Sequence, residues 1–129
     1  MKKLLLTLCL TLSPLAAQAG DIFVIAGAGT QLAGGDIRDV FVGEKQFAGP
    51  TKLIPLDNAA AQDAFLEKVV KMDKQKYTST WTKKSFRDGL NQPAVKSSDL
   101  EVVEFVKKTP GAVGYVTSQP AGVTVIQKF

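Results

Sequence analysis

The chain has 129 residues and a net charge of +4, with 16 lysines and arginines against 12 acidic residues, no histidine and one cysteine. That cysteine, Cys9, lies in a segment that we expect to be removed, so the folded part carries neither a thiolate nor an imidazole. Most nucleophiles, general bases and transition-metal ligand sets are thereby excluded. We expect a protein that is not an enzyme and that has no catalytic residue, no metal site and no cofactor.

The first 19 residues have the pattern of a cleavable secretory signal. Two lysines precede an apolar run over residues 4–12, and the segment ends in the small-residue pattern of residues 17–19. The apolar run is about half the ~20 residues that a membrane-spanning helix needs. We therefore expect removal of residues 1–19 on export, one domain over residues 20–129 in the periplasm, and no insertion into the membrane.

The basic residues of this chain are scattered among acidic ones. Nucleic acid binding favours a basic stripe with interleaved aromatic residues. We therefore expect no nucleic acid partner.

The first half of the domain predicts two strands and two helices. Residues 21–26 form an apolar run rich in β-branched residues, which indicates a buried strand, and a glycine-rich loop follows it. A short helix is expected over residues 36–42. Residues 52–56 predict a second strand, at whose end or edge Pro55 would lie because proline cannot donate to a ladder. A second helix is expected from near Ala59.

The carboxylates along this second helix are spaced as surface positions, and we expect them to be solvated. They are Asp57, Asp63, Glu67 and Asp73.

The second half predicts two more helices and two more strands. A helix is expected from Asp73, with Tyr77 and Trp81 on one face, and we expect Trp81 and Tyr115 to be largely buried. Ser98 and Glu101 form a capping box for the last helix, in which the serine accepts from the amide of residue 101 and the glutamate accepts from the amide of residue 98. Residues 112–116 and 123–126 predict strands with no helix between them, so we expect them to pair antiparallel. The result is an α/β fold with a mixed sheet of about four strands flanked by helices.

Residues 109–116, Thr-Pro-Gly-Ala-Val-Gly-Tyr-Val, resemble the motif near the end of the substrate-binding proteins of phosphate ABC transporters. Residues 37–43 resemble that family's early helix ending in glycine, and the spacing of segments 53–70 and 81–86 also agrees. The resemblance implies a periplasmic-binding-protein-like single lobe, located in the periplasm. It also implies a role in presenting phosphate or a similar oxyanion to a membrane permease.

The binding turn of that family is altered here. Phosphate binders carry an arginine, an aspartate two residues later, and a Gly-Ser-Gly-Thr turn that holds the anion. Asp57 matches the aspartate, but Pro55 stands at the arginine position and three alanines follow Asn58. These changes remove several hydrogen bonds worth roughly 1 to 3 kcal/mol each. They favour the alternative function, an interaction module of the same fold that binds no ligand and docks to a membrane permease or sensor.

If an oxyanion binds, we expect two loops to hold it together. Gly29 and Thr30 follow the first strand and would offer backbone amides and a hydroxyl. Asp57, Asn58 and Ala59 precede a helix, where free amides and the helix dipole favour an anion. Both loops would lie at one end of the sheet, since ligand sites of open α/β folds lie at the carboxyl ends of strands. An ordinary turn in each place is the alternative.

Overall fold

The computed structural model of the protein describes residues 20–129, so the predicted signal segment and Cys9 lie outside the described residues. Seven strands and six helical segments follow one another along the chain. In order they are β1 (Phe23–Ala26), η1 (Gly34–Asp36), α1 (Ile37–Phe41), β2 (Phe47–Ala48), β3 (Thr51–Lys52), β4 (Ile54–Asn58), α2 (Gln62–Phe65), η2 (Leu66–Val70), α3 (Lys74–Asp88), β5 (Ala94–Lys96), α4 (Asp99–Lys108), β6 (Ala112–Val116) and β7 (Thr124–Lys128).

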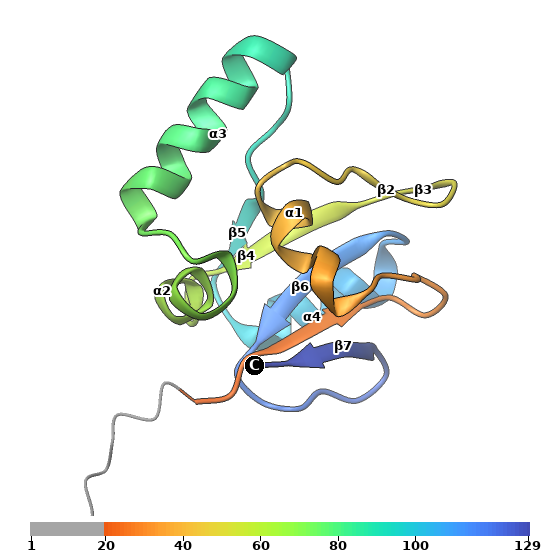
Figure 1. Ribbon diagram of the computed structural model, residues 1–129. Coiled ribbons are helices and arrows are strands. Elements are labelled where there is room, and N and C mark those ends of the chain that lie inside the picture. Colours follow the sequence, from red (N-terminus) through yellow and green to blue (C-terminus); the bar gives the residue numbers. More distant parts are fainter. Residues whose placement is uncertain (1–19) are drawn as a thin grey trace, which may run out of the picture.

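One mixed sheet of five strands, in the order β5-β4-β6-β1-β7, organises the fold (Figure 1). β4 runs parallel to β5 and β6, whereas β1 runs antiparallel to both β6 and β7. The α/β class and the mixed sheet are confirmed. The expectation that the last two strands pair with each other is wrong, because β1 lies between them and pairs with both.

Two strand features of the structure were not predicted. β5 is a three-residue edge strand beside β4, and β2 and β3 form a separate two-stranded hairpin. Both are too short to show a period-2 hydrophobic pattern, and their residues are mostly half-buried or exposed.

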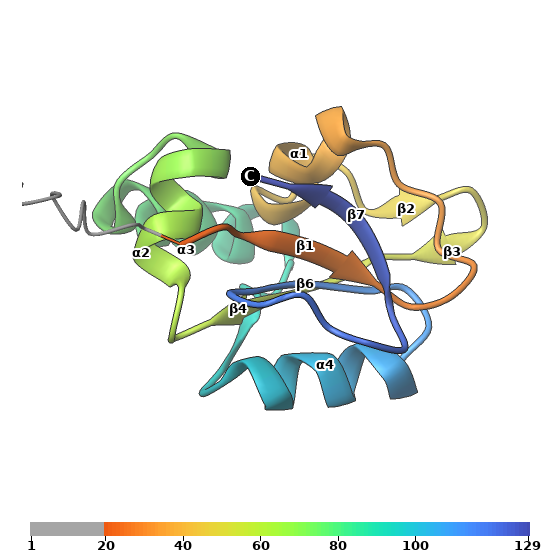
Figure 2. The ribbon, with the colours of Figure 1, turned by 90° about the horizontal axis from the view of Figure 1, so that it is seen from below.

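The sheet is covered on both faces, which makes three layers. Figure 2 shows α4 on one side of the sheet and α1, α2 and α3 on the other. Side chains alternate accordingly along β1: Val24 and Ala26 join the core under α1 to α3, and Ile25 joins the core under α4. The five-stranded sheet therefore separates two hydrophobic cores within a single lobe.

Two glycines of the 109–116 motif allow close approach around β6. A Cβ on Gly114 would lie 2.5 Å from Val102 Cγ1 of α4, so only glycine lets this helix pack on the strand. Gly111 has a φ of 84°, and a Cβ there would collide with the Lys52 carbonyl oxygen. The amide of Ile54 donates to the Gly111 carbonyl over 2.8 Å, which joins the start of β4 to the start of β6.

The helix starts follow their capping residues. The Asp73 carboxylate accepts from the Lys76 amide and begins α3, and Ser98 Oγ accepts from the Glu101 amide and begins α4. The Glu101 carboxylate accepts from the Ser97 amide rather than from that of Ser98, which corrects the predicted capping box. The second helix begins at Gln62, three residues later than expected, because residues 59–61 form a turn.

Tyr115 and Trp81 are buried as predicted, with 0% and 3% of their surface exposed. The Tyr115 ring stacks on Phe65 at 3.8 Å between centroids, and the Trp81 indole nitrogen donates to the Phe41 carbonyl over 3.0 Å. Within residues 20–129 no helix is both long enough and apolar enough to cross a membrane.

Truncating Trp81 to alanine should lower the free energy of unfolding by about 3 to 5 kcal/mol, since a large buried aromatic side chain is lost. Phe86, on the same helix but 95% exposed, provides the matched control. We expect Phe86→Ala to unfold at nearly the temperature of the unchanged protein. Thermal unfolding followed by circular dichroism measures both, and equal melting temperatures for the two variants would contradict the packing described here.

Candidate functional site

Asp57 is a buried carboxylate at the carboxyl end of β4. Its side chain is fully buried, so the expectation that it is a solvated helix-surface charge is wrong, whereas Asp63, Glu67 and Asp73 are exposed as expected. The Tyr77 hydroxyl donates to Oδ2 and the Tyr115 hydroxyl donates to Oδ1, each over 2.8 Å. Each carboxylate oxygen is therefore already hydrogen-bonded within the protein.

Burial dominates the electrostatics of this group. Loss of solvation raises the pKa of Asp57, while hydrogen bonds from Tyr77, Tyr115 and Gln62 favour its charged form and partly offset that effect. The pKa values of Tyr77 and Tyr115 are raised strongly, first by burial and then by the nearby Asp57 charge. Both tyrosines are therefore neutral hydrogen-bond donors at every physiological pH.

Asn58, the next residue, joins three elements through its side-chain amide. Its nitrogen donates to Asp99 Oδ1 over 2.8 Å and to the Tyr115 carbonyl over 3.0 Å, and its oxygen accepts from the Ala60 amide over 3.0 Å. β4, β6 and the start of α4 are thus fixed relative to one another.

Asp99 receives further donors from Thr117. The Thr117 amide and hydroxyl donate to Asp99 Oδ2 over 2.9 and 2.7 Å. Burial acts to raise the pKa of Asp99, but the hydrogen bonds from Thr117 and Asn58 outweigh it and hold the pKa below its usual value. This carboxylate is therefore an ionised acceptor inside the network.

The amides of the β4–α2 turn are also occupied. The Ala59 amide donates to the Lys96 carbonyl over 2.8 Å, the Ala60 amide to the Asn58 side chain, and the Ala61 amide to the Asn58 carbonyl over 3.0 Å. An anion at these three amides would have to displace acceptors that the chain itself supplies. The turn is closed by its own hydrogen bonds.

Gly29 and Thr30 lie at the end of the sheet opposite to the β4–α2 turn. β1 runs antiparallel to β6, and its last residue, Ala26, lies beside Val113, which pairs with Pro55 near the start of β4. Asp57, Asn58 and Ala59 are at the other end of β4. The expectation that the two loops meet is therefore wrong, because it assumed that β1 and β4 run in the same direction.

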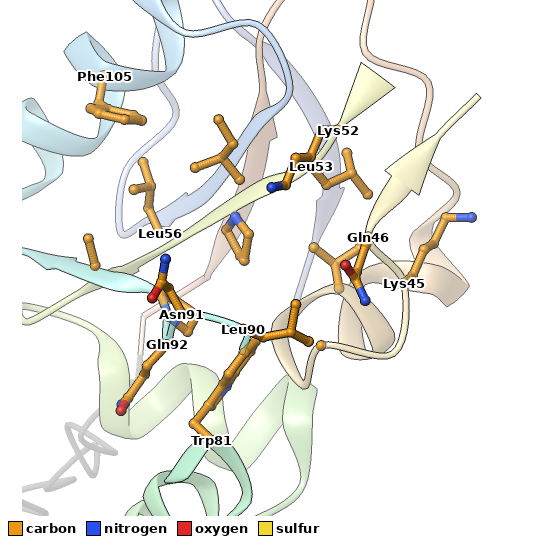
Figure 3. Close-up of a pocket in the computed structure, with 16 residues that line it drawn as sticks. Lys45, Gln46, Lys52, Leu53, Leu56, Trp81, Leu90, Asn91, Gln92 and Phe105 are labelled. Atoms are coloured by element: carbon orange, nitrogen blue, oxygen red, sulfur yellow. The ribbon is translucent and has the colours of Figure 1, made fainter. Parts of the chain in front are cut away.

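A pocket of about 310 Å³ lies beside the first half of β4 and was not predicted (Figure 3). It is lined by Val40, Gly43, Lys45, Gln46, Lys52, Leu53, Ile54, Pro55, Leu56, Trp81, Leu90, Asn91, Gln92, Pro93, Ala94 and Phe105. These residues come from segments far apart in the sequence, so no local pattern marks them. Among residues 20–129 there is no cluster of acidic side chains suited to a metal ion.

Comparison with solved structures shows the fold. Over 78% of its length the chain is similar to the crystal structure of PstS from Borrelia burgdorferi, with a TM-score of 0.52 and 12% sequence identity. The match covers 45% of the PstS chain, so the similarity extends over less than half of that neighbour. No protein-family model and no curated protein matches the sequence. The α/β lobe, with its mixed five-stranded sheet, is therefore similar in fold to part of PstS.

The raised pKa of Asp57 predicts a pH-dependent stability. An unfolded aspartate titrates near 3.8, so the stabilising contribution of protonated Asp57 is complete below that pH and is lost as pH rises through the higher folded value. Asp57→Asn cannot lose a proton there. We therefore expect the stability of the unchanged protein, relative to this variant, to decrease as the pH rises from about 4 toward neutral.

Urea unfolding of both proteins across that range measures the effect. The other carboxylates are common to the two proteins and cancel in the difference. A difference that is constant, or that grows as pH rises, would contradict the burial of Asp57.

Proposed function

We propose that the protein is a periplasmic interaction module that docks to a membrane permease or sensor and binds no oxyanion at the β4–α2 turn. The observation that carries this proposal is the closed turn: the amides of Ala59, Ala60 and Ala61 and both oxygens of Asp57 are paired within the chain. An oxyanion site needs such groups to be free. A binding role without catalysis agrees with the lack of histidine and cysteine in residues 20–129.

The periplasmic location rests on the predicted signal segment, residues 1–19. A docking role also agrees with an exposed aromatic side chain on α3. α3 stands out from the sheet in Figure 1, and Phe86 near its outer end is 95% exposed. That ring contributes almost no burial to the fold and is available to a partner.

Binding of phosphate or a related oxyanion is the second candidate function. The similarity of the lobe to PstS favours it, because the two chains share the arrangement of strands and helices. On this lobe the anion would need a second copy or a partner to cover it, together with opening of the hydrogen bonds of the turn.

Calorimetry with phosphate and sulfate separates the two candidates. For the docking module we expect no binding tighter than about 1 mM for either anion. Micromolar binding of phosphate would reverse the order of the candidates. In that case Asp57→Asn should shift the preference toward sulfate, because the aspartate accepts a proton that only a protonated anion carries.

Crosslinking in cells tests the docking role. A photoreactive amino acid at position 86, in the full chain, should give a crosslinked product in the membrane fraction. Glu104 is exposed on α4, on the other face of the sheet, and provides the control position. Equal results at the two positions, with or without a product, would contradict docking through the outer end of α3.

A further inference from the structure

The pocket beside β4 has apolar walls. Leu56 lines it from the strand, Leu53 from just before the strand, Trp81 from α3, and Leu90 and Pro93 from the segment before β5. Its volume, about 310 Å³, is within the range of small-molecule sites, about 300 to 1,000 Å³. An apolar body of a few carbon atoms would be well covered there.

The strand edge at the pocket is left open by the sheet itself. β5 pairs with β4 only from Leu56 to Asn58, so the part of β4 around Pro55 has no strand on that side. Proline carries no amide hydrogen, and the Leu53 amide already donates to the Gln46 carbonyl over 2.8 Å. An apolar group bound against this part of the chain would therefore leave no unpaired amide hydrogen at Leu53 or Pro55.

The polar groups of the pocket are all cationic or neutral. Lys45, Lys52, Gln46, Asn91 and Gln92 line it, and no acidic side chain does. Glu44, the nearest acid in sequence, is paired with Lys84 over 2.9 Å. Within residues 20–129 neither Lys45 nor Lys52 forms an ion pair.

Only one of the two lysines points toward the cavity. Figure 3 shows the Lys52 amino group turned toward the opening near Leu53 and Leu56, whereas Lys45 extends away from it. Gln46 and Asn91 lie on opposite sides of the opening. An anionic group at the mouth would meet the unpaired Lys52 ammonium, and charge-assisted hydrogen bonds of this kind are strong.

We propose that this pocket binds a small carboxylate with an apolar body, aromatic or branched aliphatic, whose carboxylate pairs with Lys52 and whose body packs against Trp81, Leu53 and Leu90. The site lies toward the start of β4, away from the Asp57 turn. The proposal is independent of the docking function and of the oxyanion candidate.

Trp81 is the single tryptophan of the chain, so its fluorescence reports on this pocket directly. We use phenylacetate as the probe, phenylacetamide as its uncharged match, and acetate as a carboxylate without an apolar body. Titration of the purified protein should change the Trp81 emission with phenylacetate, and binding of the other two compounds should be at least about tenfold weaker. Calorimetry on the same samples checks the dissociation constant.

Two lysine variants locate the charge. Lys52→Gln should weaken the binding of phenylacetate by about tenfold and leave the binding of phenylacetamide unchanged. Lys45→Gln removes the same charge from the same rim, but its amino group extends away, so phenylacetate should bind as before. Three outcomes would overturn the proposal: no saturable binding of phenylacetate, equal binding of acetate and phenylacetate, or equal effects of the two substitutions. Matching melting temperatures of the two variants ensure that lost binding is not lost folding.

Discussion

The hydrogen bonds between Asp57 and the hydroxyls of Tyr77 and Tyr115 join α3 and β6 to the central strand β4. A carboxylate at the end of a central strand is expensive to bury unless donors replace the water it loses. Here one donor comes from α3 and the other from β6, so the group that must be satisfied fixes both elements relative to β4. This matters most for α3, which buries only Tyr77, Trp81 and Lys84 along its 15 residues.

The hydrogen bonds of Asp57 and Asn58 also occupy the polar groups at the carboxyl end of β4. Asp57 is held between two neutral tyrosines, and Asn58 uses both ends of its amide to join β6, α4 and the turn. Each of these contacts makes the carboxyl end of β4 more rigid and less available to a solute. In this chain the carboxyl end of β4 is a junction between secondary structure elements.

Much of this architecture could be predicted from the sequence, and each wrong prediction has a physical cause. The apolar runs located β1, β4, β6 and β7, and the caps Asp73 and Ser98 located α3 and α4, because these signals act over a few residues. The direction and order of strands depend on residues far apart in the sequence. No residue near β1 in the sequence indicates that this strand lies between β6 and β7. Because the position of β1 was not predicted, Gly29 and Thr30 were expected at the wrong end of the sheet.

Burial of Asp57 was missed for a related reason. Its spacing from Asp63 matches a helix surface, yet it belongs to the strand before the helix, and its partners are 20 and 58 residues away. The glycines of the 109–116 motif show the reverse case. They carried the family resemblance, and their role here is packing: Gly111 admits the Lys52 carbonyl and Gly114 admits α4.

The position of β1 has a consequence for how the chain reaches its folded state. This strand pairs only with β6 and β7, and Ile22 and Phe129 exchange amide hydrogen bonds of 3.0 and 2.8 Å just beyond the paired ladder. During synthesis the first strand of the sheet therefore stays unpaired until β6, about 90 residues later, has emerged. Contacts of such long sequence separation slow folding, because loop-closure entropy is lost before any ladder forms. The topology therefore favours a nascent polypeptide in which β1 adds to the sheet only after most of the other strands have been synthesised.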